Sequence, residues 1–140
     1  MLEFLGIKLK KAKKVSVLVA DDEPKVVQTL QDRLEMDGYI VHTAYDGIEA
    51  LGKAINLKPD VVLLDIMMPE MDGLEMLENL RANPGCEDIP VIMLTARKNA
   101  EDLKRARACG VEDYIVKPFE LRSLLEKIEM IAKNKKAPVA

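Results

Sequence analysis

The sequence predicts an α/β fold in which helices cover both faces of a five-stranded parallel sheet. Five short apolar segments, rich in branched side chains, alternate with five longer segments whose apolar residues recur at helical spacing. Continuously apolar strands separated by amphipathic helices are typical of a parallel sheet buried on both faces. Five units are too few for the eight-stranded barrel, so we expect a doubly wound open sheet with five flanking helices.

The first two strand–helix units begin close to the N-terminus. Residues 15–20 form an apolar run between lysines and acids, which indicates a buried strand. Pro24 suits the first turn of the helix that follows, because that turn does not need its N–H groups. The second strand is expected over residues 39–44. Asp46 with Glu49 has the form of a capping box, so the second helix begins there.

The last three units repeat this alternation. Their strands are expected over residues 61–65, 91–95 and 113–116, and their helices from Asp72, over residues 99–108 and over residues 121–131. Asp72 and Glu75 repeat the capping pattern at the third helix. The chain thus predicts one domain over residues 15–132, with a basic extension at residues 1–14 and a tail at residues 133–140.

The composition is that of an ordinary globular domain. The 140 residues are 49% hydrophobic and 32% charged, which is enough to bury a core without disulfides. Cys86 and Cys109 have no partners at metal-ligand spacing, and a reducing, cytoplasmic location fits them best. No apolar run is long enough to cross a bilayer, so we expect no membrane-spanning segment, and a membrane location is disfavoured.

The charge is unevenly distributed. Residues 1–14 carry +4 and residues 127–140 carry +3, and because the net charge is −3, the body between them carries −10. An acidic body argues against direct binding of nucleic acid, which needs a basic face. Three interpretations of residues 1–14 stay open: a flexible extension, an added amphipathic helix, or a contact with a membrane surface.

Polar and charged side chains follow four of the five strands. They are the run Asp21-Asp22-Glu23 after the first strand, Asp65 at the end of the third, Thr95 at the end of the fourth and Lys117 after the fifth. Ligands of doubly wound sheets bind outside the carboxyl ends of the strands. Any single polar residue there is unremarkable, because polar groups naturally follow buried strands, but the set together indicates a site.

The residue types at these strand ends favour phosphoryl chemistry. Several carboxylates in one place repel each other unless a cation joins them, and an all-oxygen set without His or Cys favours Mg²⁺ or Mn²⁺ over zinc. Lys117 offers an ammonium for a phosphate oxygen and Thr95 a hydroxyl donor. Carboxylate, cation, lysine and hydroxyl together indicate transfer of a phosphoryl group onto an aspartate.

Four segments resemble the motifs of the receiver domains of bacterial response regulators, the chemotaxis-type modules of two-component signalling. They are VLVADDEP at residues 17–24, LLDIMMPEMDG at 63–73, LTA at 94–96 and YIVKPF at 114–119. Each segment alone is weakly specific, but four in this order and spacing are highly specific. The resemblance covers about residues 15–131 and implies a flavodoxin-like sheet with strand order 2-1-3-4-5.

The resemblance implies a role for each residue of the metal site. Asp65 is the phospho-acceptor and a metal ligand, and Asp22 binds the metal directly. Asp21 acts largely through metal-bound water, and the backbone carbonyl of Met67 completes the protein ligands. Lys117 pairs with Asp65 or with the phosphate, and its bond to Pro118 resembles the cis peptide of the family.

The resemblance also implies how the signal is passed on. Thr95 binds the phosphoryl group once it arrives, and Tyr114 occupies the aromatic switch position. The ring of Tyr114 then turns inward, and the surface formed by the fourth helix, fifth strand and fifth helix changes. The expected protein is a signalling phospho-acceptor rather than an enzyme with outside substrates.

The partners follow from the same resemblance. A sensor histidine kinase or a histidine phosphotransfer protein would supply the phosphoryl group, and an unidentified output protein, or a domain outside this chain, would receive the signal. The protein is expected to be a monomer, or a dimer formed on phosphorylation. The alternative is a Mg²⁺-dependent phosphatase with an aspartyl-phosphate intermediate, which is disfavoured because Met67 stands where such enzymes carry a second Asp.

Overall fold

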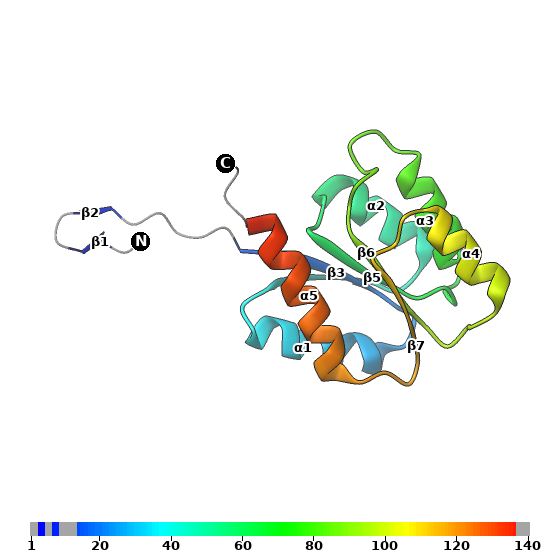
Figure 1. Ribbon diagram of the computed structural model, residues 1–140, viewed down its shortest axis with the longest axis horizontal. Helices are drawn as coiled ribbons and strands as arrows, with labels where there is room; N and C mark the ends of the chain where they lie inside the picture. Colours follow the sequence, from blue (N-terminus) through cyan, green and yellow to red (C-terminus); the bar gives the residue numbers. More distant parts are fainter. Residues whose placement is uncertain (1–2, 5–6, 9–13, 137–140) are drawn as a thin grey trace.

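The computed structural model describes residues 3–4, 7–8 and 14–136. Five parallel strands form one sheet in the order β4-β3-β5-β6-β7 (Figure 1). Their bounds are β3 Ser16–Ala20, β4 Ile40–Ala44, β5 Val61–Leu64, β6 Val91–Thr95 and β7 Asp113–Val116. Counted along the chain within this sheet, the order is 2-1-3-4-5, so the fold expected from the sequence is confirmed.

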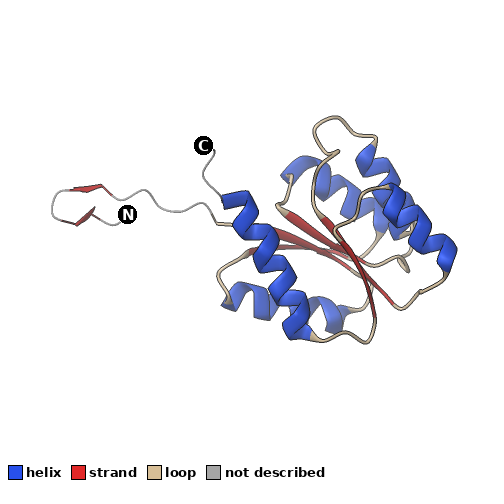
Figure 2. Cartoon of the chain, in the orientation of Figure 1, coloured by secondary structure: helices blue, strands red, loops and turns tan. Residues whose placement is uncertain are grey.

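Five helices cover the sheet. They are α1 Pro24–Met36, α2 Gly47–Leu57, α3 Gly73–Arg81, α4 Ala100–Ala108 and α5 Leu121–Lys136. Helices α1 and α5 lie on one face, and α2, α3 and α4 lie on the other, as Figures 1 and 2 show. The sheet is therefore the middle of three layers, and its side chains contribute to two separate cores.

Alternation along β3 shows how one strand serves both cores. Val17 and Val19 pack among the residues of α1 and α5, whereas Leu18 and Ala20 pack among those of α2 and α3. The central strands β3, β5 and β6 are almost entirely buried, and the edge strands β4 and β7 are largely half-buried. Continuous apolar sequence therefore marks the central strands, as expected for a doubly covered parallel sheet.

The helix starts agree with the capping predictions. The side chain of Asp46 accepts a hydrogen bond from the N–H of Glu49, and that of Asp72 accepts one from the N–H of Glu75. Pro24 stands at the first position of α1. Helices α2 and α3 therefore begin where a side chain accepts a free N–H of the first turn, and α1 begins where a proline removes one.

The two ends of the chain differ in detail from the prediction. Helix α5 continues to Lys136, five residues beyond the expected end at residue 131, so residues 133–136 of the expected tail are helical. No glycine or proline interrupts this stretch before Pro138. Glu3–Phe4 and Ile7–Lys8 are short antiparallel strands, β1 and β2, which contradicts an added helix at those four residues. The remainder of residues 1–13 lies outside the described residues.

A membrane-spanning helix is not found in the described part of the chain. None of its helices is both long and apolar enough to cross a bilayer.

Candidate functional site

Three loops at the carboxyl edge of the sheet meet around the ammonium group of Lys117. Its Nζ atom lies 2.6 Å from Asp21 Oδ2 and 3.1 Å from Asp65 Oδ2. Glu23 adds a third carboxylate, with Oε1 3.2 Å from Nζ. The acids follow β3 and β5 and the lysine follows β7, so parallel strands bring together groups that are far apart in the sequence.

Asp21, Asp22 and Asp65 form a cluster that can hold a cation. Each offers a carboxylate oxygen, and the three oxygens lie within 4.8 Å of one another. Asp21 and Asp65 are buried, with 2% and 4% of their surface exposed, while Asp22 is exposed. Oxygen ligands with one open side fit Mg²⁺, which keeps several waters when it binds to proteins. The residues present therefore fit the ion expected from the sequence.

Burial makes the charges of this cluster costly unless they are paired. Burial raises the pKa of Asp21, and the nearby Asp65 charge raises it further, while hydrogen bonds from Lys117 and the Glu23 N–H act in the opposite direction. Burial alone would lower the pKa of Lys117, but the hydrogen bond to Asp21 and the charges of both aspartates raise it well above its usual value. Lys117 is therefore firmly protonated between the two acids.

The loop after β5 is held close to Asp65 by backbone contacts. Asp65 Oδ1 accepts a hydrogen bond of 3.2 Å from the N–H of Met67, and the N–H of Gly73 donates to the Ile66 carbonyl at 2.8 Å. A Cβ atom at Gly73 would lie 2.0 Å from the Asp65 carbonyl oxygen. Only glycine therefore lets the start of α3 approach the end of β5 this closely.

The family resemblance also implied two backbone features, a metal-binding carbonyl at Met67 and a cis peptide bond between Lys117 and Pro118. The Lys117–Pro118 peptide bond is cis, as the resemblance implied. Residue Met67 is 52% exposed and follows Asp65 by two positions. Binding of a metal ion by the Met67 carbonyl stays a prediction.

Thr95 and Tyr114 form a second group, joined through Arg97. Thr95 is fully buried, and its Oγ1 accepts a hydrogen bond of 3.3 Å from the Arg97 N–H. The Tyr114 hydroxyl donates to the Arg97 carbonyl at 2.6 Å. Sequence reasoning selected the threonine and the tyrosine but gave Arg97 no contact with either, because a hydrogen bond to a backbone group leaves no mark on residue type.

Glu23 is a further residue to which the sequence assigned no role. It belongs to the acidic run after β3, and its contact with Lys117 could have been suspected from that position alone. The side chain is largely exposed, so this ion pair adds little stability, but it adds negative charge to the rim of the site.

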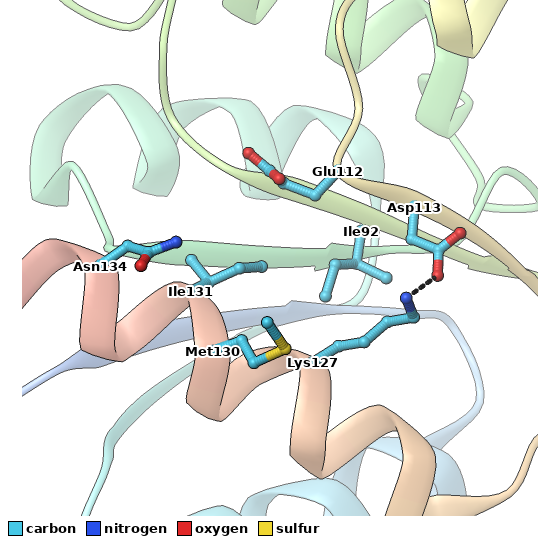
Figure 3. Close-up of a pocket in the computed structure, with 7 residues that line it drawn as sticks. All are labelled: Ile92, Glu112, Asp113, Lys127, Met130, Ile131 and Asn134. Carbon is cyan, nitrogen blue, oxygen red and sulfur yellow. Dashed lines mark ion pairs between the residues drawn. The ribbon is translucent and has the colours of Figure 1, made fainter.

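A cavity of about 190 Å³ lies at the other end of β7, against the second half of α5 (Figure 3). Asp113 and Lys127 form an ion pair of 2.7 Å across one end of it, and Met130 and Ile131 supply apolar wall. None of the residues predicted for the site lines this cavity. The cluster around Lys117 therefore remains the candidate for the chemistry.

Comparison with known proteins agrees with this geometry. The family model of the response regulator receiver domain matches residues 17–129. Response regulator MprA of Mycobacterium sp. (strain KMS) is 40% identical over 120 residues, which are 86% of this chain and 51% of that protein. The chain thus spans about half the length of the curated relatives it matches.

Solved structures show the same fold. Chemotaxis protein CheY4 of Vibrio cholerae is 34% identical, with a TM-score of 0.78 over 85% of this chain and 99% of that one. The CheY structure from Borrelia burgdorferi, solved in a CheX-CheY-BeF3-Mg²⁺ complex, is 32% identical, with a TM-score of 0.76 over 84% of this chain and 89% of that one. The sequence motifs, the sheet order and the acidic cluster agree with these matches, and the chain belongs to the response regulator receiver domain family.

Proposed function

We propose that this chain receives a phosphoryl group on Asp65 and signals by a change of shape. The observation that carries the proposal is the contact of Lys117 with both Asp21 and Asp65, beside the exposed carboxylate of Asp22. A buried carboxylate with a fixed cation on one side and room for a second cation on the other is arranged to accept a phosphoryl group. Membership of the receiver family supports the same function.

The proposed reaction is a displacement at phosphorus. A carboxylate oxygen of Asp65 attacks the phosphorus of a phosphohistidine, the phosphorus–nitrogen bond breaks, and the imidazole leaves with the electron pair and takes up a proton. Lys117 neutralises charge on the incoming phosphoryl oxygens, since its ammonium already lies within hydrogen-bonding distance of Asp65. Thr95 is free to donate its hydroxyl proton, because the Arg97 N–H occupies only an acceptor position of its oxygen.

Asp22, Asp65 and the Met67 carbonyl would hold Mg²⁺ or Mn²⁺, with Asp21 acting largely through water on the ion. When bound, the ion supplies positive charge to the phosphoryl oxygens. The acidic cluster of this chain and the Mg²⁺ named in the complex from Borrelia burgdorferi support this part of the proposal. The chain's own acids then position the acceptor and limit the directions from which a donor can approach.

The donor and the receiver of the signal are proposed by class. Receiver domains work with histidine kinases, so a sensor kinase or a histidine phosphotransfer protein is the proposed donor. Thr95 and Tyr114 would report the phosphoryl group to the surface formed by α4, β7 and α5. An output protein, or a domain outside this chain, would bind there. Dimerisation on phosphorylation is a further outcome that this surface permits.

The test is incubation with acetyl phosphate and Mg²⁺, followed by mass spectrometry of the intact protein. The wild type is expected to gain the mass of one phosphoryl group, and Asp65→Asn or removal of the metal is expected to abolish the gain. Asp32→Asn is the matched control, because Asp32 is an exposed aspartate on α1 and should leave the gain unchanged.

Two results would overturn the proposal. A mass gain that survives in Asp65→Asn would mean that another residue accepts the phosphoryl group. Rapid, Mg²⁺-dependent turnover of p-nitrophenyl phosphate by the wild type would favour the phosphatase alternative.

A further inference from the structure

The peptide groups of Arg97 stand between the two residues that would read the phosphorylation state. The N–H of Arg97 donates to Thr95 Oγ1 at 3.3 Å, and its carbonyl accepts from the Tyr114 hydroxyl at 2.6 Å. A displacement of this one residue would therefore disturb both contacts. A group that holds Arg97 in place would therefore affect how Thr95, at the phosphorylation site, is coupled to Tyr114, at the surface of α4 and β7.

Asp102, in the first turn of α4, forms an ion pair with the side chain of Arg97. Its Oδ2 lies 2.8 Å from Arg97 Nη2 and accepts a second hydrogen bond of 2.9 Å from Asn99 Nδ2. The N–H of Asp102 donates in turn to Asn99 Oδ1 at 2.8 Å, so Asn99 caps the helix. Both ends of Asp102 are thus tied to the loop that leaves Thr95.

The burial of Asp102 separates this ion pair from those on the surface. Only 3% of Asp102 is exposed, and a buried carboxylate is stable only where it is paired and hydrogen-bonded. By contrast, the ion pair between Arg105 of α4 and Glu78, at 2.7 Å, has no buried partner, because both of its side chains are exposed. Burial and these hydrogen bonds therefore hold the Asp102 carboxylate in one position, and that position in turn constrains the Arg97 side chain.

Tyr114 has space beside it. A hollow of about 330 Å³ lies between α4 and β7, and its walls include Leu103, Arg107, Tyr114 and Val116. A tyrosine ring that lost its acceptor at Arg97 could move toward this hollow without displacing the core. The hydroxyl contact therefore decides where the ring lies.

We propose that Asp102 is a positioning residue: by binding the Arg97 guanidinium it holds the Arg97 peptide groups between Thr95 and Tyr114 and couples the start of α4 to the phosphorylation site. The part of this inference that concerns signalling rests on the proposed function. The contacts themselves are present without a phosphoryl group. Loss of Asp102 should leave Asp65 able to accept a phosphoryl group but should free the ring of Tyr114.

The position of the ring can be followed by NMR of protein with ¹³C-labelled tyrosine. The chain has three tyrosines, and the Tyr114 signal is assigned by its absence in Tyr114→Phe. In Asp102→Asn the Tyr114 signal is expected to move toward that of the exposed Tyr45, while the Tyr39 signal stays in place and reports an intact fold.

A second variant and a matched control isolate the contact. Arg97→Ala removes the other half of the ion pair from a side chain that is 41% exposed, and it should move the Tyr114 signal in the same direction. The double variant should move it no further than either single variant, since both act on one contact. Glu101→Gln removes a neighbouring, exposed carboxylate from the same helix turn and should leave the signal unchanged.

The outcomes separate this inference from the proposed function. A Tyr114 signal that is unchanged in Asp102→Asn, or additive shifts in the double variant, would overturn the positioning role. With acetyl phosphate and Mg²⁺, Asp102→Asn should gain one phosphoryl group like the wild type, but its Tyr114 signal should no longer respond. If the wild type gains no phosphoryl group, the proposed function fails, yet the comparison of unphosphorylated variants still decides the role of Asp102.

Discussion

At the scale of single residues, burial decides which charged groups matter. The ion pairs Arg33–Asp37 and Glu129–Lys133 lie along exposed helix faces, where solvent screens them and they contribute little. Lys117 is only 12% exposed and faces acids that are almost completely buried. Side chains of the same types therefore form solvated surface pairs in one place and a buried, paired cluster in another.

Asp113 offers a test of a partly buried ion pair by pH. Burial raises its pKa, but the hydrogen bonds from Lys127 and from the Tyr114 N–H outweigh burial, so the pKa lies below the usual 3.8. A lowered pKa contributes stability above the unfolded value and loses it as pH falls through the folded value. We expect Asp113→Asn to be about 0.5 kcal/mol less stable than the wild type at neutral pH, a difference that is lost as the pH falls below 3.8 and through the lowered pKa of Asp113.

The measurement is urea unfolding of both proteins across this pH range. Glu112 also lines this cavity, but it is present in both proteins and so does not contribute to the difference between them. In a Lys127→Met background the Asp113→Asn substitution should lose most of its effect, because the partner of Asp113 is gone. A difference that grows as pH falls would contradict the assignment.

At the scale of elements, the first residues of α2 and α3 lie so close to the backbone of the loop after β5 that there is no space for a Cβ atom. Helix α3 begins at Gly73 against the Asp65 carbonyl, and α2 begins at Gly47, where a Cβ would lie 1.8 Å from the Met71 carbonyl oxygen. The Gly47 N–H also donates to the Pro69 carbonyl at 3.3 Å. The loop after β5 is thus enclosed by two helices, and glycine is required where each one meets it.

Gly73→Ala is therefore expected to be strongly destabilising. Its Cβ would overlap the backbone of Asp65, and backbone cannot move aside as a flexible side chain can, so the expected loss is about 3 kcal/mol in the free energy of unfolding. Urea unfolding measures it. The matched control is Gly52→Ala in the middle of α2, where a Cβ meets nothing within 4 Å. That variant should gain about 0.5–1 kcal/mol, and a similar change in both variants would contradict the packing argument.

At the scale of the whole molecule, Lys117 joins the end of β7 to the ends of β3 and β5. It lies 96 positions from Asp21 and 52 from Asp65 in the sequence, and its ammonium bridges them at the edge where β3, β5 and β7 end. The contact exists only when all three strands are in register. The site therefore forms only when the sheet has folded completely.

Lys117→Met should be less stable than the wild type at neutral pH by about 2 kcal/mol, because buried carboxylates are left without their cation. Mg²⁺ should restore much of this loss and raise the melting temperature of the variant more than that of the wild type, since the ion no longer competes with the lysine. Thermal unfolding measures both effects. Sodium chloride at the same ionic strength is the control, and an equal response to both salts would contradict binding of an ion.

Much of this molecule could be predicted because its sequence patterns are local. The alternation of strands and helices, the caps at Asp46 and Asp72 and the proline at the start of α1 are all visible within a few neighbouring residues. The strand limits differ by about one residue from those expected. The extension of α5 beyond residue 131 was missed, because a lysine-rich stretch reads equally as helix or as tail.

The sequence by itself therefore determined the fold class, the strand order that the family resemblance implied, and the polar residues at the strand ends. Tertiary structure decided which of these residues meet. It placed Glu23 with Lys117, the Arg97 peptide groups between Thr95 and Tyr114, and Asp102 on the Arg97 side chain. The physical reason is range: periodicity and caps arise between near neighbours, whereas these contacts depend on how loops from separate strands pack at one edge of the sheet.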